Sequence, residues 1–107
     1  MSNDVMQYQL VLQWPVSRTK DLDFLIKIED VLLGMLSKLH EVDGHDIGSG
    51  ELNIFVLTND PLTAFDEVKA ALPESDVWSD LRVAYRAIDK NGYTILWPTH
   101  LSKFEVQ

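Results

Sequence analysis

Residues 48–61 read G-S-G-E-L-N-I-F-V-L-T-N-D-P, and this stretch contains signals for three successive elements. Residues 48–50 are a short turn signal, and residues 51–58 are rich in the β-branched and large apolar side chains typical of a strand. Residues 59–61 then supply a capping residue and a proline for the first position of a helix. The stretch therefore predicts a turn, a strand and a helix start in direct succession.

The sequence before this stretch predicts a strand and a long helix. Residues 8–14 alternate between large apolar and mostly polar side chains, which predicts a strand with one buried face. Residues 20–39 carry an apolar stripe at helical spacing, with Thr19 or Asp21 as N-cap. Glu29 lies inside the apolar arc, where it should either extend its carboxylate to solvent or pair with a base. The stripe comprises Leu22, Leu25, Ile28, Leu32, Met35, Leu36 and Leu39. Its arc exceeds half the circumference, so we expect the excess to meet the second helix, the C-terminal tail or another subunit.

The remaining sequence predicts a second helix and two hairpins. Residues 39–46 pair with residues 51–58, and residues 82–88 pair with residues 93–97 across an Asn-Gly turn. The second helix is expected to end at Pro73. Its expected core face consists of Leu62, Phe65, Val68 and Leu72.

These elements predict a single α+β domain over residues 1–107. Their order is the ferredoxin-like β-α-β-β-α-β arrangement with an extra C-terminal strand. Right-handed crossovers place both helices on one face of an antiparallel sheet. The open face carries apolar side chains, and we expect a homodimer to cover them, with the C-terminal tail as the alternative.

Charge is concentrated in the middle of the chain. The net charge is −8, which argues against a nucleic acid or an anionic membrane as partner, and the absence of cysteine excludes thiolate chemistry. Residues 39–81 hold ten acids against Lys69, whereas residues 1–38 carry −1 and residues 82–107 carry +2. This middle segment is either a solubilising surface or a docking face for a basic protein.

The termini and the apolar runs predict a cytoplasmic location. Residues 1–6 have no basic start followed by an apolar run, so they do not read as a signal peptide. The longest apolar run, residues 31–36, is far shorter than the ~20 residues that a membrane span needs.

The densest group of chemistry-bearing residues is H-E-V-D-G-H-D-I-G-S-G-E at residues 40–51. In a regular strand Glu41, Asp43 and His45 would share one face and offer oxygen and nitrogen ligands to a metal. The spacing matches no metal motif such as H-E-x-x-H, and a polar edge strand has the same composition, so we expect no cofactor. Asp43, His45 and Asp46 are the ligands of the alternative interpretation. The candidate binding face comprises Glu41, Asp43, His45, Asp46, Glu51, Asn53 and Phe55.

Aromatic and basic residues near the C-terminus have two interpretations each. Trp78 and Trp97, with other aromatic residues, either build a pocket or pack the core and its rim, and we expect packing. Arg82 and Arg86 share one face of their strand, where they either bind an anion or, as we expect, pair with the acidic segment. His100 is expected at the surface.

Residues 43–55, D-G-H-D-I-G-S-G-E-L-N-I-F, resemble a hairpin of small bacterial ferredoxin-like α+β proteins. The similarity extends to Trp97-Pro98 and so covers most of the chain. This resemblance implies a fold and a bacterial source, and no activity carries over with it.

The sequence therefore favours a non-enzymatic binding module whose acidic hairpin engages a basic protein. A toxin is one such partner, because small acidic α+β immunity proteins are similar in size and charge. One alternative is a small metal- or ligand-binding enzyme that uses His45 with Asp43, Asp46 or Glu51. Another is a structural homodimer subunit.

Overall fold

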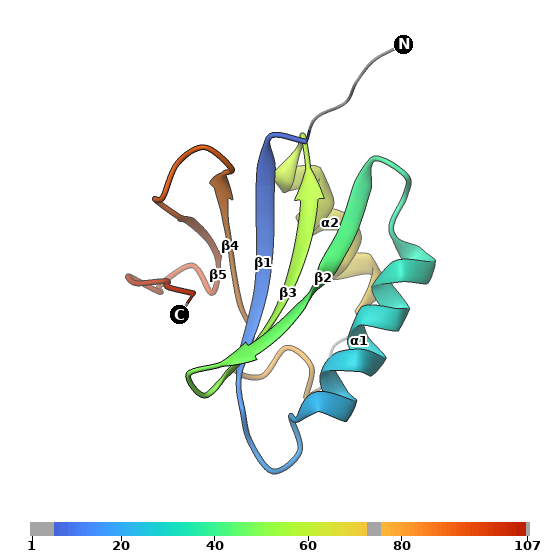
Figure 1. The fold of residues 1–107 in the computed structure, drawn as a ribbon, viewed down its shortest axis with the longest axis vertical. Coiled ribbons are helices and arrows are strands. Elements are labelled where there is room, and N and C mark those ends of the chain that lie inside the picture. The colour runs from blue at the N-terminus through green and yellow to red at the C-terminus, as the bar shows by residue number, and fades with distance from the viewer. Residues whose placement is uncertain (1–5, 73–75, 107) are drawn as a thin grey trace.

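The computed structural model describes residues 6–72 and 76–106, over which it has five strands and two helices. In chain order these are β1 (Tyr8–Pro15), α1 (Leu22–Met35), β2 (His40–Gly48), β3 (Glu51–Thr58), α2 (Pro61–Ala71), β4 (Arg82–Ala87) and β5 (Thr94–Trp97). The strands form one antiparallel sheet in the order β2-β3-β1-β4-β5 (Figure 1). The predicted α+β class with an antiparallel sheet is confirmed.

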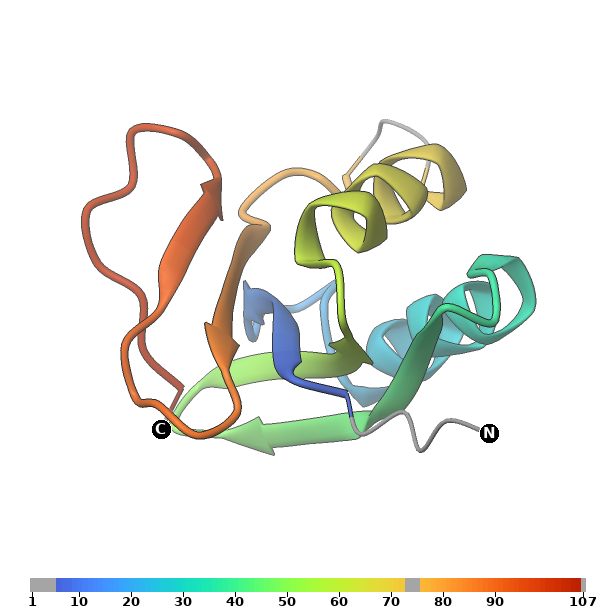
Figure 2. The ribbon, with the colours of Figure 1, turned by 90° about the horizontal axis from the view of Figure 1, so that it is seen from above.

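Both helices cover the same face of the sheet, and the hydrophobic core lies between the two layers (Figure 2). The alternation predicted for β1 is confirmed, because Leu10, Leu12 and Trp14 point into this core and are fully buried. The Trp14 ring packs edge-to-face on Phe24 of α1 at 5.3 Å between centroids. Its indole Nε1 donates to the carbonyl of Val77 at 2.7 Å, which holds the segment before β4 against the core.

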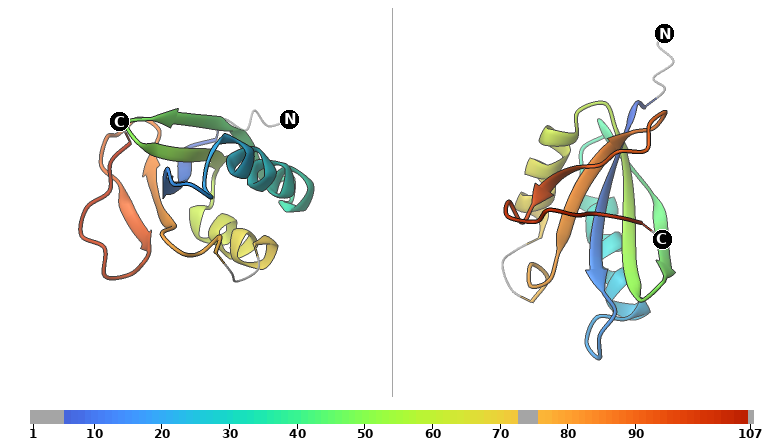
Figure 3. Two further views of the ribbon diagram at one scale, coloured as in Figure 1. Left: turned by 90° about the horizontal axis from the view of Figure 1, so that it is seen from below. Right: turned by 90° about the vertical axis from the view of Figure 1, so that its left-hand side faces the viewer.

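The C-terminal tail crosses the opposite face of the sheet, which we call the far face (Figure 3). Gln13 Nε2 donates both to Asn53 Oδ1 at 3.0 Å and to the backbone carbonyl of Glu105 at 2.9 Å. The rings of Tyr93 and Phe104 also meet, with centroids 4.9 Å apart. The tail, which was the alternative cover, therefore occupies part of the far face, and the homodimer stays a prediction.

The helices begin where the sequence indicates, but α1 ends earlier than predicted. Asp21 is the N-cap of α1, since its carboxylate accepts from the amide of Phe24 at 3.1 Å. The expected end at residue 39 is wrong, because Leu36 is already extended and the Ser37 amide donates to the Glu67 carboxylate at 2.8 Å. A side chain from α2 thus takes the hydrogen bond that would continue the helix.

The prediction that Leu62 belongs to the core face of α2 is wrong. Leu62 is exposed, whereas Phe65, Val68 and Leu72 are buried as expected. Pro61 occupies the buried position at the start of the helix, and successive residues turn by about 100°, so Leu62 points away from the sheet. Pro73, predicted to end this helix, lies outside the described residues.

The β2–β3 hairpin contains a β-bulge that the sequence analysis did not predict. Val42 faces Val56 and Gly44 faces Phe55, so Asp43 is an extra residue on β2. Gly44 has φ +136°, a region that residues with a Cβ rarely adopt. The bulge therefore depends on glycine at this position.

We expect Gly44→Ala to lower the free energy of unfolding by about 1–3 kcal/mol, because alanine is strained at this φ. Gly34→Ala is the matched control, since Gly34 lies inside α1 with open space around its Cα. That change should raise stability by about 0.5–1 kcal/mol. Urea unfolding measures both, and a Gly44→Ala variant as stable as the wild type contradicts the role given to the bulge.

Candidate functional site

The structure divides the predicted binding residues of β2 between the two faces of the sheet. Glu41 faces Leu57 and Asp46 faces Asn53, which places both acids on the far face. His45 faces Ile54, a core residue, and so lies on the helix face. The prediction that Glu41, Asp43 and His45 share one face is therefore wrong, because the bulge at Asp43 reverses the alternation after it.

His45 connects β2 to α1. Its Nδ1 lies 3.0 Å from Oε1 of Glu29, which confirms the second alternative, that this glutamate pairs with a basic side chain. Across residues 6–72 and 76–106, no cluster of three or more His, Asp or Glu side chains has an arrangement suited to a metal ion. Asp43, His45 and Asp46, the ligands of the alternative interpretation, are accordingly not gathered into one.

The predicted residues on β3 have structural partners. Glu51 accepts from Arg82 Nη2 at 2.7 Å, and Asn53 is buried beside Gln13. Phe55 is half-buried on the far face. The expected pairing of arginine with the acidic segment is thus confirmed for Arg82.

The same expectation is wrong for Arg86. Its Nη1 lies within 3.3 Å of three backbone carbonyl oxygens, which accept from it around the turn after β4. These carbonyls belong to Ala87, Ile88 and Lys90. Backbone acceptors close in sequence therefore satisfy this guanidinium in place of an acid.

The middle segment has nine acids in the described part of the chain, and they fall into two groups; the tenth, Glu74, lies outside that part. The first group stabilises the fold and comprises Glu51, Asp60, Asp66, Glu67 and Asp80, which cap a helix or bond to nearby side chains. The carboxylates of the second group have no hydrogen bond or ion pair to any residue in the described part of the chain, and this group comprises Glu41, Asp43, Asp46 and Asp76. Three of these four lie on β2, at the edge of the sheet.

His40 and Glu67 fix the start of β2 to α2. His40 is buried, and its Nδ1 and Nε2 lie 2.8 Å from Thr58 Oγ1 and 3.2 Å from Glu67 Oε2. The Ser37 amide donates to the Glu67 carboxylate, which lowers the pKa of Glu67; the Ser37 hydroxyl and His40 lower it further. His40 is therefore a structural residue of the hairpin.

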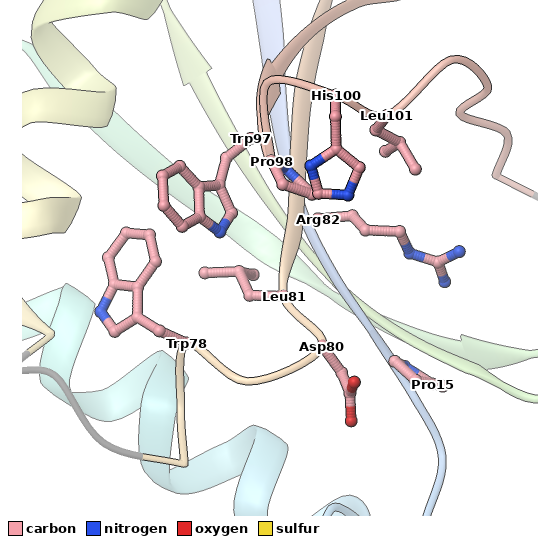
Figure 4. A pocket seen from close by; sticks show the side chains of 9 residues that line it. All are labelled: Pro15, Trp78, Asp80, Leu81, Arg82, Trp97, Pro98, His100 and Leu101. Atoms are coloured by element: carbon pink, nitrogen blue, oxygen red, sulfur yellow. The ribbon is translucent and has the colours of Figure 1, made fainter.

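A surface cavity of ≈ 470 Å³ lies at the opposite end of the sheet (Figure 4). The rings of Trp78 and Trp97 meet edge-to-face there, with centroids 5.5 Å apart, and His100 lies on the rim. The Arg82 side chain runs away from both indoles toward its bond with Glu51 (Figure 4). A pocket at Trp78 and Trp97 was the predicted alternative to packing, and both occur here, because the two rings pack on each other and also line the cavity.

No protein-family model matches the chain, and neither a curated protein nor a solved structure matches it significantly. In the described residues, neither helix has the length and apolar character that crossing a membrane requires.

We expect Glu67→Gln to lower the melting temperature at pH 7, because the amide cannot replace the charged acceptor of Ser37 and His40. A carboxyl with a lowered folded-state pKa contributes stability above its ordinary pKa of 4.5 and loses it as the pH falls through the folded value. The melting temperature of the variant should therefore change less than that of the wild type below pH 4.5.

Thermal unfolding over a pH series measures this difference. Asp66→Asn is the control, since Asp66 is an exposed neighbour whose only described partner is Lys69, one helical turn away. The control should keep the pH profile of the wild type. Parallel profiles for Glu67→Gln and the wild type contradict the role assigned to Glu67.

Proposed function

We propose that this protein is a non-enzymatic binding module that docks a basic protein on the acidic edge formed by β2. The observation that carries the proposal is the distribution of unpaired acids. The carboxylates of Glu41, Asp43 and Asp46 are exposed and bond to none of the described residues, whereas those of five other acids of the middle segment are engaged in the fold. We call the strand with these three side chains the acidic edge.

The charges of the acidic edge act together. A strand rises about 3.3 Å per residue, so the three carboxylates lie within roughly 17 Å of one another. Neighbouring carboxylates along the strand are about 7–10 Å apart, which is about one Debye length at physiological salt, so their fields overlap, attract a positively charged surface and speed its association. Such complementarity selects partners by sign of charge and makes their binding depend on salt.

The proposal includes a ferredoxin-like fold. It is supported by the β-α-β-β-α-β order of the first six elements, by the neighbour order β2-β3-β1-β4 and by both helices lying on one face, with β5 added beside β4. Such folds host many functions, so docking is argued from the charges and not from the fold. We also propose that the protein acts in a bacterial cytoplasm and has an immunity-type role, in which the basic partner is a toxin.

Reversing the charges of the acidic edge tests the proposal. The variant Glu41→Lys/Asp43→Lys/Asp46→Lys is compared with the control Asp23→Lys/Asp30→Lys/Asp76→Lys, which reverses three other exposed acids. Both variants change the net charge equally, so a difference between them reports location. We expect affinity purification from source cells to recover the same basic protein with the wild type and the control, and to lose it with the acidic-edge variant.

The purified partner then provides a quantitative check. Its Kd for the wild type should rise at least about tenfold between about 50 and about 300 mM salt, because exposed charge pairs are screened. Circular dichroism confirms that each variant is folded. Recovery of the partner by the acidic-edge variant, or equal loss with both variants, overturns the proposal.

A further inference from the structure

The helix α1 lies beside β2 at the end of the sheet, on the side away from β1 (Figure 1). Glu29 marks the side of α1 that meets β2, since it bonds to His45. Leu22 and Ile26 lie seven and three residues before Glu29, and Leu33 lies four residues after it. These spacings place all three side chains on the same side of the helix as Glu29. They are 46%, 40% and 60% exposed, so this side of α1 is apolar and open.

The helix face of β2 continues this apolar surface. Ile47 is 44% exposed and faces Leu52, and it follows His45 along β2 toward the end of α1 where Leu22 and Ile26 lie. At the other end of β2, Leu33 and Val42 line a surface cavity of ≈ 340 Å³ between the helix and the strand. Exposed apolar side chains thus lie on both sides of the Glu29–His45 pair along the outer side of β2, on the helix face of the sheet. We call this set, Leu22, Ile26, Leu33 and Ile47, the apolar floor.

The far face of β2 has the opposite character. Glu41 and Asp46 point to this face, and Asp43 lies at the bulge between them. The outer backbone edge of β2 hydrogen bonds to no other strand in the described residues, because β2 is the last strand of the sheet on that side. The same edge therefore offers backbone donors and acceptors, an apolar floor on one face and negative charge on the other.

We propose that the basic partner binds by adding a strand to β2, through a segment in which apolar residues alternate with lysine or arginine. This inference rests on the proposed function and specifies the segment that the acidic edge takes. Successive side chains of a strand point to opposite faces, so the apolar ones would lie on the α1 floor and the basic ones beside Glu41 and Asp46. Strand addition of this kind obtains affinity from backbone hydrogen bonds and specificity from alternate side chains.

A second copy of this chain does not fit the same edge. Pairing β2 with another β2 would bring the Glu41 and Asp46 carboxylates of both copies onto one face, about 4.8 Å apart between strands, where like charges repel. The charges therefore select a basic partner over self-association.

Two synthetic peptides of identical composition test strand addition. The first, K-V-K-V-K-V-K, alternates, and the second, K-K-K-K-V-V-V, separates the same residues into blocks. We expect the alternating peptide to bind the wild type at least about tenfold more tightly, because only this peptide, as a strand, has all its valines on one face and all its lysines on the other. Binding should slow amide hydrogen exchange in β2 and leave the exchange of β5 unchanged.

Two variants assign the faces of the bound strand. Leu33→Ser removes part of the apolar floor and should weaken binding of the alternating peptide by about five- to tenfold. Leu62→Ser is the matched control, because Leu62 is a comparably exposed leucine on α2, and it should leave binding unchanged. Glu41→Gln/Asp46→Asn should weaken both peptides and reduce the salt dependence of their binding.

The outcomes separate this inference from the proposed function. Equal affinity of the two peptides without protection of β2 amides overturns strand addition and leaves docking on the acidic edge in place. If neither peptide binds, strand addition is also overturned. The charge-reversal experiment then tests by itself whether a basic protein docks on the acidic edge. A dimer whose β2 amides are protected without peptide overturns the choice of a basic partner over a second copy.

Discussion

The strand β1 is hydrogen bonded along both of its edges, to β3 and to β4, and the structure has to cover both of its faces. Leu10, Leu12 and Trp14 are buried under the helix layer, and on the other side Val11 is buried and Gln13 bonds to the tail. A strand in this position tolerates no unpaired backbone group and little exposed apolar surface. The helices, the segment before β4 and the C-terminal tail are all arranged to meet these two demands.

The outer strands β2 and β5 each have one edge that pairs with no other described strand, so they can carry exposed charged side chains. In the described chain, the acids of the middle segment without a side-chain partner lie mainly on β2. The interior of the sheet and the loops use Glu51, Asp60 and Glu67 as acceptors for arginine, backbone amides and serine. Those acids belong to the stability of the fold. Of the other acids of the middle segment in the described chain, Glu41, Asp43 and Asp46 lie together on β2, next to the exposed apolar side of α1.

Local patterns predicted most of the fold because they act over a few residues. The alternation in β1, the Asp60-Pro61 helix start and the turn at residues 49–50, where both φ angles are positive, are each determined by neighbouring side chains. The bulge was missed because the period-two pattern assumes an unbroken register.

The candidate site was predictable only in part, because long-range partners decide which polar residues stay free. His45, Glu51 and Asn53 were assigned to the binding face from their composition. Their partners Glu29, Arg82 and Gln13 lie 16, 31 and 40 residues away in the sequence, and no local pattern indicates such pairs. Glu41 and Asp46 remain available because no distant residue in the described chain reaches them.

The hydrogen bond from Gln13 to the carbonyl of Glu105 spans 92 residues. During synthesis on the ribosome, the first strand emerges long before the segment that will cover its far face. Gln13 and Asn53 can pair with each other once β3 has emerged, but they stay open to water until the tail follows. The order of translation thus leaves the far face of the nascent sheet uncovered until the segment around Glu105 has emerged from the ribosome.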